Sequence, residues 1–319
     1  MDTVLDKPVL MLIYKRPDTT RETFKAIREA KPTRLYVSAA GPATESERAS
    51  CEAARAIIDE VDWNCEVRRN FMQDNRGCRV NVSRGISWAL EHENEMIILE
   101  DDCVATRSFF RFCAELLDRY RHDQRVMSIS GTNFLFGYQA TSHSYFWSRY
   151  PNIWGWATWK RAWDYYDTDL ALWPQARADG SLRDIFDQLR PRTYWRMVLD
   201  VVADGKLDAW DFVWFLSCWL RGGLSAQPTV NLVRNIGFDA NATHTKKANK
   251  LARMPVAELP FPLDHPSDVQ RNRKADNRIE QQVYSKWANL ASLWLYHSAR
   301  RLPPGVKDKL RLLARRGTR

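Results

Sequence analysis

Hydrophobic residues in the first 130 positions occur in short continuous runs, and the segments between these runs have apolar residues at helical spacing. Such runs are typical of strands that are buried on both faces of a sheet. We predict five strands, at 9–14, 34–37, 65–68, 96–99 and 126–129, and helices at 17–30, 45–60, 79–92 and 108–121. The alternation indicates an α/β fold with a mostly parallel sheet flanked by helices.

After about residue 135 the pattern changes, and aromatic residues become frequent. Most of the 14 tryptophans lie between positions 147 and 219, where spacing predicts helices at 156–166, 193–203 and 212–221. The segment 254–277 is rich in proline and charge, which indicates irregular structure. We therefore predict one domain over residues 1–255, with a first half at 7–135, a helical, tryptophan-rich second half at 136–255, and an irregular, basic C-terminal extension at 256–319.

The apolar runs have the length of strands and are too short to cross a bilayer. The N-terminus, Met-Asp-Thr, lacks the basic start and apolar core of a secretory signal. These features predict a cytoplasmic protein. The six cysteines have no paired spacing, so we expect buried free thiols rather than disulfides.

The formal net charge of +9 is concentrated near the C-terminus, at 246–250 and 300–319. No helix-turn-helix, zinc-finger or RNP pattern accompanies it, so we expect no nucleic-acid partner. An apolar patch at 287–294 precedes the last basic segment. This combination predicts peripheral association with the anionic inner face of the cytoplasmic membrane. A solvated helical face is the alternative.

Three consecutive carboxylates, Glu100, Asp101 and Asp102, directly follow the strand predicted at 96–99. They repel one another, and the construction of a sheet does not require them. Ligands of parallel sheets bind beyond the carboxyl ends of the strands, and carboxylate oxygens suit Mn²⁺ or Mg²⁺. We therefore predict a divalent cation at this point. The alternative is an acidic turn that caps the helix predicted from Ser108.

The segment 97–102, followed by Phe109-Phe110, resembles the E-D-D signature of the N-acetylglucosaminyltransferases that start N-glycan branching, and of their bacterial GT-A relatives. Four further segments resemble that family in the same order, over roughly residues 7–245: Pro8–Arg16, Ser83–Leu90, Tyr150–Trp156 and Ala209–Asp211. The resemblance implies a Rossmann-like GT-A fold, a Mn²⁺ (or Mg²⁺) cofactor and an inverting sugar transfer. It also implies a nucleoside-diphosphate sugar donor, with a UDP-sugar expected, and a glycan or lipid-linked acceptor in surface polysaccharide or glycoconjugate biosynthesis.

The resemblance also implies roles for the residues of the donor site. Asp102 would bind the metal, and Asp101 would contact the ribose or a metal-bound water. Glu100 would support these two carboxylates, and Arg16 would lie beside the base or the diphosphate. The chain departs from the family at Ala40, where an acidic residue reads the nucleobase.

Asp211, in the Trp-Asp element, would be the catalytic base that takes the proton of the acceptor hydroxyl, with Asp208 as a substitute. A helix cap is the alternative for Asp211. The loop from Asn75 to Arg79 opens a helix, where backbone amides and the Arg79 side chain would bind a diphosphate. A glycine turn with solvated arginines is the alternative there.

Trp154 and Trp156 are candidates for stacking on acceptor sugar rings, with core packing as the alternative. His244 is a candidate ligand of the metal or the diphosphate, and His265 is a weaker one.

Two other functions remain open. A sugar nucleotidyltransferase would also use a parallel sheet and Mg²⁺, but such enzymes usually open with a glycine-rich phosphate loop, and this chain has no glycine before Gly41. A glycan-binding protein on a degenerate transferase fold is the second alternative, and Ala40 motivates it.

Overall fold

The computed structural model describes residues 4–238, 250–286 and 293. The chain divides into two compact units, one formed by residues 1–171 and 208–277 and the other by residues 172–207 and 278–319. Position 256, where we predicted the C-terminal extension to begin, falls inside the first unit. The segments predicted to bind a membrane, 287–294 and 300–319, lie outside the described residues except for Leu293.

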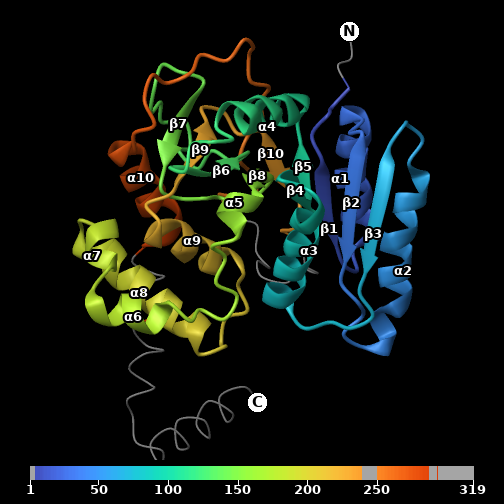
Figure 1. Ribbon diagram of the computed structural model, residues 1–319, viewed down its shortest axis with the longest axis horizontal. Helices are drawn as coiled ribbons and strands as arrows, with labels where there is room; N and C mark the ends of the chain where they lie inside the picture. The colour runs from blue at the N-terminus through green and yellow to red at the C-terminus, as the bar shows by residue number, and fades with distance from the viewer. Residues whose placement is uncertain (1–3, 239–249, 287–292, 294–319) are drawn as a thin grey trace, which may run out of the picture. The chain divides into compact units, whose positions relative to one another are not determined.

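The first unit contains a sheet of eight strands in the order β3-β2-β1-β4-β8-β6-β9-β7 (Figure 1). Parallel pairing joins β3, β2, β1 and β4, and also β6 and β9, whereas β8 and β7 run antiparallel to their neighbours. The strands are β1 (Val9–Ile13), β2 (Arg34–Ala39), β3 (Glu66–Phe71), β4 (Glu95–Glu100), β6 (Val126–Ser130), β7 (Tyr145–Ser148), β8 (Trp156–Trp159) and β9 (Leu224–Pro228). The predicted α/β class, with a mostly parallel sheet, is confirmed.

Helices cover both faces of this sheet, and alternate residues of each buried strand contribute to two cores. Val9, Met11 and Ile13 of β1 pack with side chains of α1 and α4, while Leu10 and Leu12 pack with those of α3, α5 and α9. The helical segments of this unit are α1 (Pro17–Ala30), η1 (Glu45–Glu47), α2 (Arg48–Ala56), η2 (Ile57–Glu60), α3 (Cys78–His92), α4 (Arg107–Arg119), α5 (Lys160–Trp163), α9 (Asp211–Leu220) and α10 (Arg273–Ile279), which continues past residue 277.

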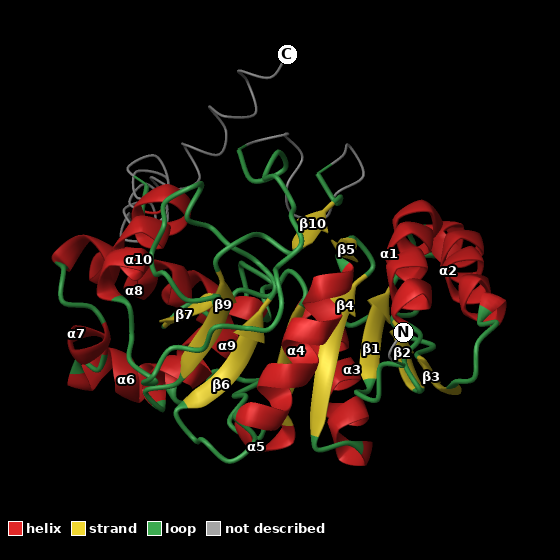
Figure 2. Ribbon diagram, turned by 90° about the horizontal axis from the view of Figure 1, so that it is seen from above, coloured by secondary structure: helices red, strands yellow, loops and turns green. Residues whose placement is uncertain are grey.

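A second, two-stranded sheet pairs β5 (Cys103–Ala105) with β10 (Val233–Asn235) in antiparallel register, and the two strands lie side by side in Figure 2. This pairing brings a late segment of the chain next to the residues that follow β4. It is the feature of the fold that matters most for the candidate site.

The second unit contains the helices α6 (Trp173–Asp179), α7 (Leu182–Ile185) and α8 (Leu189–Ala203) and a π-helix, η3 (Glu280–Tyr284). Trp195 organises its interior: the indole packs against Phe186 and Tyr284, and its nitrogen donates a hydrogen bond to Glu280 at 3.1 Å. Among the described residues of either unit, no helix has both the length and the apolar character needed to span a bilayer.

Each of the five predicted strands is confirmed, but two predicted helices differ from the structure. The helix predicted at 45–60 is divided into η1, α2 and η2. The helix predicted at 156–166 is wrong over its first four residues, which form β8, and only Lys160–Trp163 is helical. Strands β7, β8 and β9 lie in a tryptophan-rich region that we predicted to be helical. The prediction failed because a segment with apolar side chains on every face fits the periodicity of a helix and that of a strand equally well. The six cysteines are free, as predicted, and four of them are buried.

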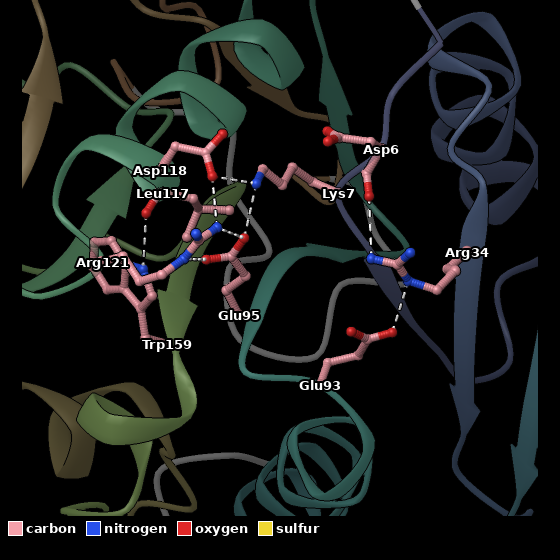
Figure 3. A network of polar contacts seen from close by, with 9 residues as sticks. All are labelled: Asp6, Lys7, Arg34, Glu93, Glu95, Leu117, Asp118, Arg121 and Trp159. Atoms are coloured by element: carbon pink, nitrogen blue, oxygen red, sulfur yellow. Dashed lines mark hydrogen bonds and ion pairs between the residues drawn. The ribbon is translucent and has the colours of Figure 1, made fainter.

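A balanced network of charges holds the N-terminal end of β4 (Figure 3). Lys7 donates hydrogen bonds to Glu95 at 2.9 Å and to Asp118 at 2.6 Å, and Arg121 donates to the same two carboxylates. Burial raises the pKa of Glu95, but the hydrogen bonds from Arg121 and Lys7 outweigh burial and lower this pKa below its usual value. Two cations therefore neutralise two anions at this end of the strand.

Candidate functional site

The three predicted carboxylates lie at the opposite, C-terminal end of β4. Because β1 and β4 are parallel, Arg16, just after β1, reaches the same edge of the sheet. Its guanidinium donates hydrogen bonds to Asp101 and, at 2.8 Å, to Asp102. We call Arg16, Glu100, Asp101 and Asp102 the acidic corner. The resemblance implied that all four belong to the donor site, and the structure brings them together.

The acidic corner does not cap the following helix. The N-cap of α4 is Thr106, whose side chain accepts a hydrogen bond from the backbone nitrogen of Phe109 at 3.3 Å. This contact provides the helix start with its own cap. The carboxylates of the acidic corner are thus not needed for the start of α4, and the alternative interpretation does not hold.

Negative charge in the acidic corner exceeds positive charge. Burial, followed by repulsion from Asp102, Asp101 and Asp211, raises the pKa of Glu100 well above its usual value. Burial likewise raises the pKa of Asp101, to about 6, although Arg16 opposes this increase. The side chain of Asp101 is almost wholly buried, and its Oδ2 atom has no hydrogen-bond partner in the described part of the chain. A buried carboxylate oxygen without a partner is unfavourable for folding, which is a reason to expect a ligand at this point.

The chain after β10 encloses Asp102. The backbone nitrogen of Ile236 donates to the Asp102 carbonyl at 2.8 Å, and the side-chain amide of Asn235 lies 3.4 Å from Asp102 Oδ1. Gly237 leaves no room for a side chain, because a Cβ atom there would collide with Asp102 Oδ2. Sequence reasoning missed Asn235 and Gly237, since only the β5–β10 pairing places them here; no local pattern signals it.

Asp211 is the first residue of α9, one position after the N-cap residue, Trp210. Burial is the largest cause of the raised pKa values of Glu100, Cys78 and Tyr166, and the charge of Asp211 raises each of them further. Asp211 therefore lies close to these three side chains. The hydroxyl of Tyr166 donates to the backbone carbonyl of Trp210, the residue before Asp211, at 3.3 Å. The predicted base therefore lies near the acidic corner, and Tyr166, which sequence reasoning missed, holds the start of its helix.

The loop before α3 uses its backbone amides internally. The nitrogens of Cys78 and Arg79 donate to the carboxylate of Asp208 at 2.6 and 3.1 Å, and the nitrogen of Gly77 donates to Asn75 Oδ1 at 2.9 Å. The prediction that these amides bind a diphosphate is therefore wrong for this conformation, because Asp208 already occupies the helix N-terminus. For the same reason Asp208 does not replace Asp211 as the base.

Asn75 and Arg79 have different environments in this loop. The side chain of Asn75 is used on both sides, since its nitrogen donates to the Gly41 carbonyl at 3.1 Å and its oxygen accepts from Asn81 at 2.9 Å. The Nε atom of Arg79 is buried without a hydrogen-bond partner among the described residues. Of the two residues predicted to bind the sugar donor, Arg79 is therefore the one whose side chain retains an N–H group for a ligand, at Nε.

The two predicted acceptor tryptophans lie in different surroundings. Trp156 is fully buried and packs against Trp163, Trp210 and Trp214, so that no face of its ring is open to a sugar and the prediction for this residue is wrong. Trp154 is only half-buried. It packs edge-to-face against Phe238, which directly follows Gly237, and the two rings are 5.4 Å apart. Trp154 thus stands next to the acidic corner.

The structure places only one of the two histidine candidates, His265. His244 lies outside the described residues. His265 is bound elsewhere, to the Tyr145 hydroxyl at 3.0 Å and to Glu115 at 3.1 Å. Over the described ranges, no three His, Cys, Asp or Glu side chains converge as a metal site made of protein ligands alone would require. Mg²⁺ bound with a nucleotide typically needs only one or two carboxylates, with phosphates and water completing its shell.

Comparisons with known protein families and with curated protein sequences find no match. Among solved structures, one similar chain is described as UDP-glucose pyrophosphorylase complexed with UDP-glucose. It has 9% sequence identity and a TM-score of 0.24, over 39% of this chain and 62% of the other. The match thus spans less than two thirds of that protein, and at this level of similarity it carries no argument about activity.

Fold and site together define an α/β protein with a Rossmann-like parallel half. Four acidic side chains, Glu100, Asp101, Asp102 and Asp211, interact near the carboxyl ends of its strands, where ligands of such sheets bind.

Proposed function

We propose that the protein is a metal-assisted glycosyltransferase that moves a sugar, with inversion, from a nucleoside-diphosphate sugar to a glycan or lipid-linked acceptor. The observation that carries this proposal is the surplus of carboxylates around Arg16, together with the Asp101 Oδ2 atom, which has no hydrogen-bond partner among the described residues. The order of motifs along the sequence supports the same assignment. A UDP-sugar is the expected donor.

The residues of the acidic corner fit a divalent cation. Asp102 retains partial exposure, and its Oδ1 atom has long contacts to the amide of Asn235 at 3.4 Å and to the thiol of Cys103 at 3.6 Å. Asp102 would hold Mn²⁺ or Mg²⁺, with Asp101 bound to the ribose or to a metal-bound water. When bound, the cation neutralises the charge that develops on the diphosphate leaving group.

The chain's own residues supply binding, orientation and proton transfer. Arg16 would contribute a positive group that binds the diphosphate, and Arg79 would add a second one. Trp154 would present an aromatic face to the acceptor sugar. Asp211 would accept the proton of the attacking hydroxyl, with its helix held by Tyr166. His244 would complete the metal or diphosphate contacts.

A donor screen tests the proposal. Hydrolysis of UDP-, GDP-, CMP- and dTDP-sugars is measured with Mn²⁺ and with chelator, for the wild-type protein and for Asp102→Ala and Asp211→Asn. We expect metal-dependent turnover of one donor, its loss in Asp102→Ala, and a decrease of about 10²–10⁴-fold in Asp211→Asn. Metal-dependent turnover that survives in Asp102→Ala would refute the site assignment. Pyrophosphate release from a nucleoside triphosphate and a sugar 1-phosphate would assign nucleotidyl transfer instead.

A further inference from the structure

A groove outside the acidic corner lies along α3 in the first unit. Six of its lining residues follow one another at helical spacing on a single face of α3: Val80, Ser83, Arg84, Ser87, Trp88 and Glu91. Asn70 of β3 and Thr168 complete the lining. The volume is about 310 Å³, at the lower end of the range for small-molecule sites. These six residues of α3 have the spacing of a helix face that packs against a core, but most of them are polar.

The packing of α3 explains why this face stays uncovered. The opposite face of the helix is held against the sheet at Gly85, where a Cβ atom would lie 2.7 Å from Ser38 Oγ and 2.9 Å from Leu12. Beside α3, the edge strand β3 has exposed and half-buried side chains along its length. The groove therefore has one helical wall and one wall from the edge of the sheet.

The side chains of the groove combine a flat apolar ring with uncommitted polar groups. Trp88 is half-buried and is held edge-to-face by Tyr36 and His92, at 5.5 and 6.0 Å between ring centroids. The side chains of Asn70 and Glu91 make no hydrogen bond or ion pair to the rest of the described chain. Ser87 accepts a bond from Trp163 at 3.0 Å and keeps its own proton to donate.

The charges of the lining residues select the ligand class. Arg84 is paired with Asp74 at 3.6 Å, and Glu91 is the other charged lining residue, so the groove has no surplus positive charge for a phosphate or a nucleic acid. A neutral sugar ring matches it better, because such a ring has one face of C–H groups that stacks on an indole and a rim of hydroxyls that both donate and accept hydrogen bonds. We propose that this groove binds a neutral carbohydrate unit.

The position of the groove suggests how such a unit relates to the acidic corner. The six residues of α3 begin at Val80, directly after the turn of α3 that Asp208 caps, and extend about 16 Å along the helix to Glu91. A sugar in the groove would be a remote part of a longer glycan chain. Its binding does not depend on the proposed transfer reaction, since no residue of the acidic corner lines the groove.

The test is binding of glucose, galactose, mannose and N-acetylglucosamine to the full-length protein, followed by ligand-observed NMR in the presence of a chelator. We expect at least one of these sugars to bind, and Trp88→Ala to weaken that binding by about tenfold or more. Asn70→Ala, which removes a side chain that makes no hydrogen bond to the rest of the described chain, should weaken it by about threefold. Asp102→Asn should leave it unchanged, which separates this proposal from the transferase proposal.

Two results would overturn the groove proposal. One is the absence of binding by all four sugars at tens of millimolar concentration. The other is binding that Trp88→Ala and Asn70→Ala leave unchanged. Thermal unfolding of each variant checks that a loss of binding does not reflect a loss of fold, and the Asn70→Ala result decides the matter if Trp88→Ala is unstable.

Discussion

The two ends of strand β4 have the same kind of residue in opposite electrostatic states. At the N-terminal end, Glu95 is buried between Lys7 and Arg121, and its pKa is lowered. At the C-terminal end, Glu100 belongs to a group of carboxylates that share one arginine, and its pKa is raised well above the usual value. Six residues of one strand thus connect a neutralised end to an end that carries excess negative charge.

This contrast indicates which end of β4 stabilises the fold and which end is arranged to bind a ligand. A buried charge with partners on all sides is satisfied without any further group. A cluster of like charges with an unpartnered oxygen is unfavourable for folding, and such clusters are frequent at functional sites because a ligand or substrate relieves them. We therefore infer that β4 is anchored at Glu95 and functions at Asp102.

The largest expected effect comes from neutralising each end in turn. Glu95→Gln should reduce the free energy of unfolding by about 3 kcal/mol, because it leaves the almost wholly buried Lys7 with only the exposed Asp118 as a partner. Glu100→Gln is the matched control on the same strand, and it should leave stability unchanged or slightly increased, because it removes repulsion. Urea unfolding at pH 7 in chelator measures both variants. Equal losses of stability would contradict the comparison.

The pH dependence of stability should differ in sign between the two ends. The pKa of Asp101 is about 6 in the folded protein, above its unfolded value of about 3.9, so its contribution to stability is full below about pH 4 and is lost as pH rises to about 6. Between about pH 4 and about pH 6 in chelator, the free energy of unfolding of the wild-type protein should therefore decrease by roughly 2 kcal/mol relative to that of Asp101→Asn.

Glu95 should behave in the opposite way. Its folded pKa is lowered, so its contribution is present above the unfolded value and is lost only as pH falls through the folded value. Urea unfolding from about pH 2 to pH 7 for the wild type, Asp101→Asn and Glu95→Gln resolves the two trends, because the folded pKa of Glu95 lies below its usual value. If the difference in unfolding free energy between the wild type and Asp101→Asn does not change with pH, the pKa of Asp101 is not raised in the folded protein.

A methyl group at Gly237 should disturb the functional end with a smaller effect on folding. Gly237→Ala would push against Asp102, so we expect a loss of about 1–2 kcal/mol in stability and about tenfold weaker Mn²⁺ binding. Gly222→Ala is the control, because Gly222 has a φ of +65° and open space around it, so that only its backbone is strained. If both variants bind Mn²⁺ alike, the contact between Gly237 and Asp102 has no functional role.

The smallest expected effect is at the rim of the structural end. Asp118 bonds to Lys7 and Arg121, but its side chain is 55% exposed. Asp118→Asn should therefore change the free energy of unfolding by only about 0.5 kcal/mol. Thermal unfolding measures this difference; a loss as large as that of Glu95→Gln would show that the network is not centred on Glu95.

The parallel half of the fold could be predicted from sequence because each of its buried strands is a short apolar run between amphipathic helices. The tryptophan-rich region could not be predicted in this way, since the apolar residues Trp156 and Trp159 fit a helical pattern as well as a strand pattern. They form β8 instead of a helix. Antiparallel strands inserted beside β4 leave no pattern in the local sequence. They depend on contacts between distant segments.

The acidic corner was also predictable in part. Three adjacent carboxylates after a buried strand conflict with local expectations, and such conflicts mark functional sites. The roles of Asp208, Asn235 and Gly237 were not predictable, because each contacts a residue more than a hundred positions away. Trp156 was misassigned for a related reason: burial depends on its packing against distant Trp210 and Trp214, which the sequence around it does not reveal.

Binding of Mn²⁺ in the presence of UDP, followed by the loss of the free-ion signal in electron paramagnetic resonance, tests the central claim most directly. The account predicts that the wild-type protein and Glu95→Gln, measured where both are folded, bind one ion per chain, and that Asp102→Asn binds none in the same range. Binding by Asp102→Asn equal to that of the wild type, or no binding by the wild type with any nucleoside diphosphate, would contradict the assignment of the C-terminal end of β4 as the functional end.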